Sequence, residues 1–251
     1  MIRELERQQA IRRQLSSMPD APQRAGAAVL PTGFASLDRA LGIGGLPAGR
    51  IVEIFGPPSS GKSALALQII AHRQRSGGAA AWIDADHTFD GAFAARLGVD
   101  VSALPVAVPG STEEALQMAR RFAASSAVDL VTLDSVAALV PELEHETGIG
   151  QAGHALPGRV LGRELRPLAL VAARSGVCIL LLNQTRARPA GAGAGETSSG
   201  GPALKLHAAV RIVLAASGRR VRLRVLKNKL AAPFTVAELE WLPGSGFTAP
   251  H

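Results

Sequence analysis

The sequence predicts an α/β protein in which a mostly parallel central sheet is covered by helices on both faces. Three observations support this prediction. Short apolar runs recur along the chain, stretches with helical periodicity separate them, and glycine and proline mark the turns between them. Apolar residues make up 47% of the 251 positions and the mean hydropathy is +0.19, so the chain can fill a sizeable core.

The expected elements alternate in order along the chain. We expect strands at residues 50–55, 79–84, 128–134 and 177–184, and helices at residues 62–76, 89–97, 112–126 and 158–175. After residue 207 apolar and polar residues alternate over 208–216, 219–229 and 234–242, which predicts an antiparallel extension of the sheet. Between the two parts, residues 186–203 form a low-complexity stretch that we interpret as one long functional loop.

The N-terminal stretch predicts a separate element. Residues 2–15 have the spacing of a short helix with one apolar side, and residues 16–28 are a Pro/Ala/Gly linker. A helix held away from the body by a linker needs a surface to dock on, either on its own domain or on a neighbouring subunit. We therefore interpret residues 1–30 as a helix and linker for subunit docking, and residues 31–251 as the core.

The composition argues against membrane and secreted classes. No apolar run approaches the roughly 18 residues that span a bilayer, and the N-terminus lacks the apolar region of a secretory signal. The single cysteine, Cys178, lies within an apolar run and is expected to be a buried core residue. We expect a cytoplasmic protein with no membrane partner.

The charge is unevenly distributed. The chain carries +7 overall, but residues 151–229 carry 14 Lys or Arg against only Glu164 and Glu196, a balance of +12. A segment this one-sided repels itself unless a polyanion lies against it, and nucleic acid is the obvious candidate. An alternative is a generally basic surface, but that would spread the charge more evenly.

The stretch "GPPSSGKS" between an expected strand and an expected helix predicts a nucleoside triphosphate site. It matches the pattern G-x-x-x-x-G-K-[ST] at every fixed position. Glycines let the backbone curl around phosphates, free N–H groups at a helix N-terminus attract anions, the lysine neutralises the outer phosphates and the serine hydroxyl can hold Mg²⁺. The residues of this phosphate loop are Gly56, Pro57, Pro58, Ser59, Ser60, Gly61, Lys62 and Ser63.

Polar residues end three other expected strands. Asp134 ends an apolar strand, where a carboxylate can orient Mg²⁺ beside a phosphate loop. Asp84 and Asp86 follow the second strand and share a face if that strand continues, so either could position a water for hydrolysis. Asn183 and Gln184 place amides at the end of another strand, where a group can sense the γ-phosphate and report it to the following loop.

Long stretches of the sequence resemble the bacterial RecA recombinases. The resemblance extends from about Leu30 to Pro243 and rests on "LPTGFASLDRALGIGGLPAGRIVEIFGPPSSGKSALALQII", "IDADHTFDGAFAARLGVD", "VDLVTLDSVAALVPELE" and "VLKNKLAAPF". It implies a RecA-type P-loop NTPase core that polymerises on single-stranded DNA, with ATP between adjacent subunits. The chain is expected to be a short form or paralogue, because the family's C-terminal domain is absent after His251.

The same resemblance implies roles for individual residues. The phosphate loop would hold ATP, and Ser63 and Asp134 would serve Mg²⁺. Asp86 falls where the family has its catalytic glutamate, and Gln184 where it has its γ-phosphate sensor. Asp90 and Phe93 would border the adenine, Lys227 and Lys229 would reach the ATP of a neighbouring subunit, and four arginines would lie in or beside two DNA-contacting loops: Arg159, Arg166, Arg186 and Arg188.

The sequence leaves two functions open. One is a DNA-dependent ATPase that binds single-stranded DNA, forms a filament with itself and acts in homologous recombination and DNA repair. The other is a regulatory ATP-binding protein that modulates a recombinase filament or a translesion polymerase assembly without strand exchange. Double-stranded DNA, a full-length recombinase and a repair polymerase are further candidate partners. A complete phosphate loop and both lysines favour the first function, because a pure scaffold has no evident use for them.

Overall fold

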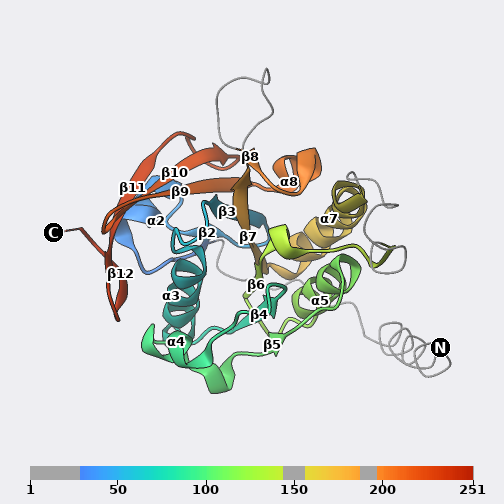
Figure 1. Ribbon diagram of the computed structural model, residues 1–251, viewed down its shortest axis with the longest axis horizontal. Coiled ribbons are helices and arrows are strands. Elements are labelled where there is room, and N and C mark those ends of the chain that lie inside the picture. The colour runs from blue at the N-terminus through green and yellow to red at the C-terminus, as the bar shows by residue number, and fades with distance from the viewer. Residues whose placement is uncertain (1–28, 144–155, 187–196, 251) are drawn as a thin grey trace.

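The computed structural model describes residues 29–143, 156–186 and 197–250. One sheet of ten strands runs through this part of the chain (Figure 1). Its order from one edge is β12 (Gly246–Thr248), β11 (Val236–Leu242), β10 (Arg220–Asn228), β9 (Val210–Ser217), β3 (Ile51–Gly56), β7 (Cys178–Arg186), β6 (Leu130–Asp134), β4 (Ala80–Asp84) and β5 (Val106–Ala107), with β8 (Thr197–Ser198) beside β7.

The centre of this sheet is parallel and one side is antiparallel. Strand β3 pairs in parallel with both β7 and β9, and β6 continues the parallel set through β4 to β5. Strands β9, β10, β11 and β12 pair antiparallel in succession. The predicted fold class, including the antiparallel extension after residue 207, is therefore confirmed.

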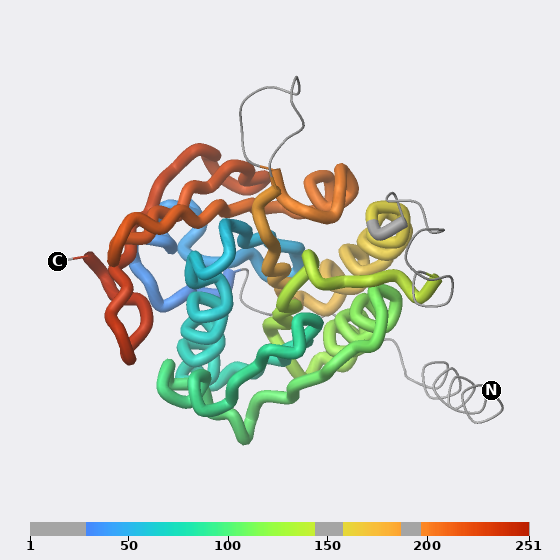
Figure 2. The backbone as a smooth tube through the Cα atoms, viewed as in Figure 1, coloured from blue at the N-terminus to red at the C-terminus, as the bar shows by residue number. Residues whose placement is uncertain are grey.

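Helices cover both faces of the sheet, as Figure 2 shows for α3 (Lys62–Arg75) on one side and for α5 (Thr112–Ala124) with α7 (Leu156–Ser175) on the other. Alternate residues of each strand enter two separate cores. In β7, Leu180 and Leu182 pack with α3 and with α2 (Ala35–Leu41), whereas Ile179 and Leu181 pack with α5, α7 and α8 (Gly201–His207). Two-sided burial explains why these strands read as continuous apolar runs.

Short elements complete the described chain. Strands β1 (Val29–Leu30) and β2 (Leu46–Pro47) form a separate antiparallel pair. Helix α4 (Gly91–Arg96) follows β4, and two 3₁₀ turns lie at Val101–Ala103 and Val136–Ala138. Among the described residues no helix is both long and apolar enough to cross a membrane.

The prediction of one loop over residues 186–203 was wrong at its ends. Arg186 still belongs to β7, Thr197 and Ser198 pair with its last residues as β8, and α8 begins at Gly201. The sequence did not predict β8, because this two-residue strand is defined by its pairing with β7, which is a tertiary contact and leaves no local sequence pattern. The predicted helix at 2–15 and the linker lie outside the described residues.

We expect the central strands to be sensitive to loss of volume. Leu180→Ala removes a fully buried side chain from β7 and should lower the free energy of unfolding by about 3 kcal/mol, because the cavity it leaves can collapse only in part. Leu170→Ala, on α7 with 53% of its side chain exposed, is the matched control and should change it by about 0.5 kcal/mol or less. Urea denaturation measures both, and equal losses would contradict the two-core description.

Candidate nucleotide-binding site

The phosphate loop lies between β3 and α3, at the carboxyl end of β3. Gly61 precedes α3 with φ +88°, a left-handed conformation that favours glycine, and a Cβ there would lie 2.4 Å from the ring of Phe247. Pro57, Pro58 and Ser59 are exposed, and no side chain caps the N-terminus of α3. Pro57 and Pro58 have no N–H, so the donors that the loop can offer to a phosphate are the backbone N–H groups of Ser59 and of the uncapped start of α3, from Gly61 to Ser63.

The ammonium of Lys62 folds back over this loop. Its Nζ donates to the carbonyl of Pro57 at 2.7 Å, to that of Gly56 at 3.2 Å and to Ser60 Oγ at 3.4 Å. Burial lowers the pKa of Lys62, while Asp134 and Asp86 act in the opposite direction. A partly desolvated cation beside the uncapped N-terminus of α3 is well placed to meet the oxygens of a polyphosphate.

Two carboxylates lie next to the loop. Ser63 Oγ donates to Asp134 Oδ2 at 2.6 Å, and Ser135 Oγ donates to both carboxylate oxygens of Asp86, at 3.1 and 3.2 Å. Strand β4 ends at Asp84, whose carboxylate instead accepts the backbone N–H groups of the next turn, at Thr88 and Phe89. Both carboxylates lie near Asp134, but Asp84 is engaged by the backbone of the turn, whereas Asp86 is held by the hydroxyl of Ser135.

The electrostatics of Asp134 suit a hard cation. Burial raises the pKa of this carboxyl from 3.8 to about 6; the hydrogen bond from Ser63 and the charge of Lys62 oppose the rise, whereas Asp86 and Asp84 add to it. A divalent cation would offset this repulsion, and the hydroxyl of Ser63 and the carboxylate of Asp134 are the all-oxygen ligands that Mg²⁺ accepts. The residues present therefore fit Mg²⁺.

The residues expected to border the base lie on α4. Asp90 caps this helix, since its Oδ1 accepts from the backbone N–H of Ala92 at 2.8 Å and of Phe93 at 3.0 Å. The ring of Phe93 is half-buried with the guanidinium of Arg96 5.6 Å from its centroid. Their contact with a base stays a prediction.

Gln184 lies beside the start of the phosphate loop. It is the register partner of Gly56 in the parallel pair β3–β7, and its side chain is half-buried. Parallel pairing thus brings the amide of Gln184 to the strand edge where the phosphates are expected.

Lys227 and Lys229 lie at the opposite edge of the sheet. Lys227 Nζ donates to the carbonyl of Lys205 at 2.5 Å, and both ammonium groups donate to that of Leu206 at 3.2 Å, near the end of α8. Lys229 also lines a cavity of about 320 Å³ together with Ile51, the first residue of β3. Because the phosphate loop follows the last residue of β3, the two sites are about 17 Å apart along the strand. These lysines therefore cannot serve the phosphate site of their own subunit.

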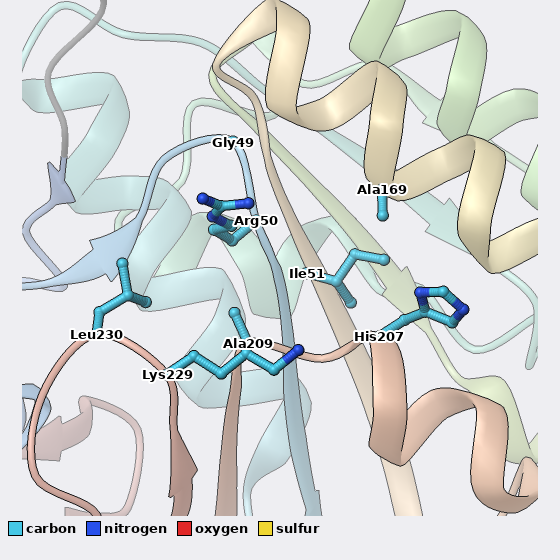
Figure 3. Close-up of a pocket in the computed structure, with 8 residues that line it drawn as sticks. All are labelled: Gly49, Arg50, Ile51, Ala169, His207, Ala209, Lys229 and Leu230. Atoms are coloured by element: carbon cyan, nitrogen blue, oxygen red, sulfur yellow. The ribbon is translucent and has the colours of Figure 1, made fainter.

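Figure 3 shows Lys229 and His207 reaching toward this cavity from two different elements, with Arg50 on the turn before β3. Burial lowers the pKa of His207, and the charges of Lys229, Arg166 and Lys227 lower it further. The sequence did not identify Arg50 and His207 as candidate functional residues, because only the fold places them in the same cavity as Lys229.

The predicted DNA-contacting arginines do not form one cluster. Arg159 and Arg166 are exposed on α7, and the charge of Arg166, like those of Lys227 and Lys229, lowers the pKa of His207. Arg186 is exposed at the other end of the sheet and donates to Ser199 Oγ at 2.8 Å. Arg188 lies outside the described residues.

The comparison with known families decides the classification. The family model described as the RecA N-terminal domain matches residues 14–248. The chain belongs to the RecA family. It is 45% identical over 231 residues to protein RecA of Bifidobacterium breve, covering 88% of this chain and 59% of that protein, and 47% identical over 230 residues to protein RecA of Thermus thermophilus, covering 87% and 68%.

The solved structure of the RadB recombinase shares the fold. It superimposes with a TM-score of 0.71 at 19% identity, over 89% of this chain and 100% of that one. The chain spans less than two thirds of the length of the Bifidobacterium RecA protein. The predicted membership of the RecA family is confirmed.

We expect Asp134→Asn to stabilise the nucleotide-free protein at neutral pH. Because the folded-state pKa of Asp134 lies above its ordinary value of 3.8, the folded protein holds an extra proton between about pH 4 and pH 6, and stability falls as the pH rises through that window. The rise of this pKa from 3.8 to about 6 corresponds to a loss of about 3 kcal/mol in the free energy of unfolding once Asp134 is ionised. The asparagine variant should recover most of that loss at pH 7.5.

Urea denaturation at pH 5 and pH 7.5 measures this effect, and the gap between parent and variant should be smaller at pH 5. Asp100→Asn, at an exposed carboxylate that caps a 3₁₀ turn, is the control and should gain nothing at either pH. A variant of Asp134 that is less stable than the parent at pH 7.5 would contradict the electrostatic description of the site.

Proposed function

We propose that this chain is an ATP-dependent protein of the recombinase type, which binds single-stranded DNA, forms filaments and acts in homologous recombination and DNA repair. The observation that carries the proposal is the convergence at one sheet edge of Lys62 over the phosphate loop, the Ser63–Asp134 pair and the Asp86–Ser135 pair. A triphosphate, a metal ion and a hydrolytic water each have a matching group there.

In this proposal the chain's own residues divide the work of ATP hydrolysis. The loop from Gly56 to Ser63 and the ammonium of Lys62 hold the phosphates, and Ser63 with Asp134 would hold Mg²⁺, which would neutralise charge that develops on them. Asp86 orients the attacking water and accepts its proton, while the hydroxyl of Ser135 fixes the carboxylate. Gln184 would contact the γ-phosphate, and Asp90 and Phe93 would border the base.

The opposite edge supports head-to-tail assembly. Lys227 and Lys229 lie far from their own phosphate loop, and apolar side chains near them are unusually exposed: 66% for Leu206 and 72% for Phe234. A surface of this kind fits against a different surface of a second copy, and repetition of the contact gives a filament. The lysines of one subunit would then reach the ATP of the next, and residues 1–30 would add to the contact outside the 31–251 core.

The proposed DNA contacts rest on charge. Residues 151–229 carry the balance of +12, and Arg159, Arg166 and Arg186 are exposed within it. Such a surface binds the phosphates of single-stranded DNA, and with Arg188 it would line the DNA path of the filament. Double-stranded DNA, a full-length recombinase and a repair polymerase remain candidate partners.

We expect Asp86→Glu to raise the turnover of ATP. Asp86 is one methylene shorter than the glutamate that the RecA family is expected to have at this position. A catalytic water misplaced by about 1 Å can lower the rate about a hundredfold. The variant should increase kcat by up to about that factor with little change in KM, measured by phosphate release with single-stranded DNA present. Asp86→Asn is the control and should bind ATP without hydrolysing it. Unchanged or reduced turnover in Asp86→Glu would contradict a geometric limit at this residue.

Assembly is tested by mixing two inactive variants. Lys62→Ala damages the phosphate loop but keeps the edge lysines, and Lys227→Met damages that edge but keeps the phosphate loop. Because a working site needs one intact half from each of two subunits, the mixture should recover partial ATPase activity, and parent activity should rise faster than linearly with protein concentration.

Arg222→Ala is the matched control on the same strand as Lys227. Its guanidinium pairs with Glu238 on an exposed part of the sheet, so the variant alone should remain active. Activity that is proportional to concentration, with no recovery on mixing, would exclude the filament and leave a nucleotide-binding protein that acts as single subunits.

A further inference from the structure

The turn between β4 and α4 carries Asp86. We call its residues 84–89 the aspartate turn. The carbonyl of Asp134, at the end of β6, accepts the backbone N–H of Ala85 at 2.7 Å and that of Asp86 at 3.2 Å. Asp84 lies beside Asp134 as its register partner in the parallel pair β4–β6. The chain thus leaves β4 while its backbone is still attached to the strand that ends at Asp134.

The carboxylate of Asp84 closes this turn from the other side. Its Oδ1 accepts the backbone N–H of Thr88 at 3.1 Å, and its Oδ2 accepts that of Phe89 at 3.0 Å. The residue is only 5% exposed, so both bonds are shielded from water. Because Asp84 begins the turn while Thr88 and Phe89 end it, the two bonds fix the path of the backbone between them.

That path includes a strained residue. His87 has φ +56°, a left-handed conformation that costs free energy for a residue with a Cβ, although histidine tolerates it better than most. Residues keep such conformations where the surrounding bonds over-determine them, and they concentrate at functional sites. The side chain of His87 is exposed, so burial of the imidazole does not explain the strain. The bonds from Asp84, which enclose His87, do explain how it persists.

A carboxylate is an electrostatically unfavourable choice for holding this turn. Burial is the main cause of the raised pKa of Asp134, and the charges of Asp86 and Asp84 raise it further. Asparagine and serine also stabilise turns and carry no charge, so turn formation alone does not account for Asp84. A carboxylate differs from them in offering two oxygens to two N–H groups, through charge-assisted bonds about twice as strong as neutral ones.

We infer that Asp84 is a positioning residue for ATP hydrolysis, which holds His87 in its left-handed conformation and thereby directs the carboxylate of Asp86 toward the phosphate loop. Ser135 Oγ holds the carboxylate of Asp86 itself, at 3.1 and 3.2 Å. Asp84 fixes the backbone that carries this carboxylate. The inference rests on the proposed function, because it assumes that Asp86 orients the attacking water.

Asp84→Asn tests the role of the two bonds. It keeps the size of the side chain but replaces one acceptor oxygen with an NH₂ group, which then faces a backbone N–H. The variant should lower kcat about tenfold to a hundredfold, because a displacement of about 1 Å near the reacting atoms has an effect of this size. Its Kd for a labelled non-hydrolysable ATP analogue with Mg²⁺ should stay within about threefold of the parent. Phosphate release with single-stranded DNA present gives kcat, and fluorescence anisotropy gives Kd.

Rescue by glycine at position 87 separates positioning from a loss of stability. Glycine adopts positive φ without strain, so His87→Gly should keep kcat within about twofold of the parent. In the Asp84→Asn background it should recover at least about threefold of the lost kcat, because the turn then depends less on the missing bond. His87→Val introduces a β-branched residue, for which this backbone is an outlier, and should lower kcat about tenfold.

Asp38→Asn is the matched control. Asp38 Oδ1 accepts the backbone N–H of Thr32 at 2.9 Å and its hydroxyl at 2.7 Å, so this carboxylate also closes a turn. It lies on α2, which carries none of the proposed site residues. The variant should lower the stability of the protein in urea denaturation and leave kcat unchanged.

Several results would overturn the inference: a parent-like kcat in Asp84→Asn, equal losses of kcat and analogue affinity in that variant, or no recovery in the double variant. If Asp84→Asn does not fold, equal kcat values in His87→Gly and His87→Val overturn it instead.

Asp86→Asn separates the inference from the proposed function. If Asp86→Asn is inactive while Asp84→Asn matches the parent, the inference alone fails. If Asp86→Asn hydrolyses ATP at the parent rate, or if the parent does not hydrolyse ATP, the proposed function fails and the inference with it.

Discussion

The hydrogen bond from Ser63 to Asp134 joins the start of α3 to the end of β6, and the nucleotide site is arranged around it. The bond exists because parallel strands end at one edge of the sheet, where a loop from β3 and a carboxylate from β6 meet. Burial and the charges of Asp86 and Asp84 raise the pKa of Asp134 to about 6, although the hydrogen bond from Ser63 opposes this rise. The site is thus held in a state that is electrostatically unfavourable until a cation arrives.

The end of the sheet that carries Lys227 and Lys229 holds several positive charges, which repel one another as the carboxylates near Asp134 do. Burial lowers the pKa of Lys227, and the neighbouring charges of Lys229 and Arg211 lower it further, so a cluster of cations lies where an anion would relieve the repulsion. The carboxylates beside the phosphate loop and the cations around Lys227 lie at opposite ends of the sheet, so they cannot neutralise each other within one subunit. Two copies in the proposed head-to-tail contact would bring these opposite charges together, and this argument for the proposal does not depend on the family.

A row of three polar side chains, the buried Glu53 and Asn183 and the partly buried Arg211, lies between these two edges. It crosses β7, β3 and β9 at mid-sheet and replaces apolar contacts with directional bonds at Glu53. Fully satisfied polar networks in a protein interior favour one unique arrangement of the core. In this protein these bonds tie β7, β3 and β9 together next to the phosphate loop.

The sequence by itself determined the fold class, the phosphate loop and its partner Asp134, because each depends on local patterns: continuous apolar strands, a fixed glycine and lysine spacing, and a carboxylate at a strand end. The position at a strand end did not separate Asp84 from Asp86; the resemblance to the family selected Asp86, and only the fold shows that Asp84 accepts the N–H groups of the next turn. It also could not reveal β8, the cavity that Arg50 shares with His207, or the pairing of Glu53 with Arg211. Those features join residues far apart in the chain, as Glu53 and Arg211 are by 158 positions, and only strand order and register bring them into contact.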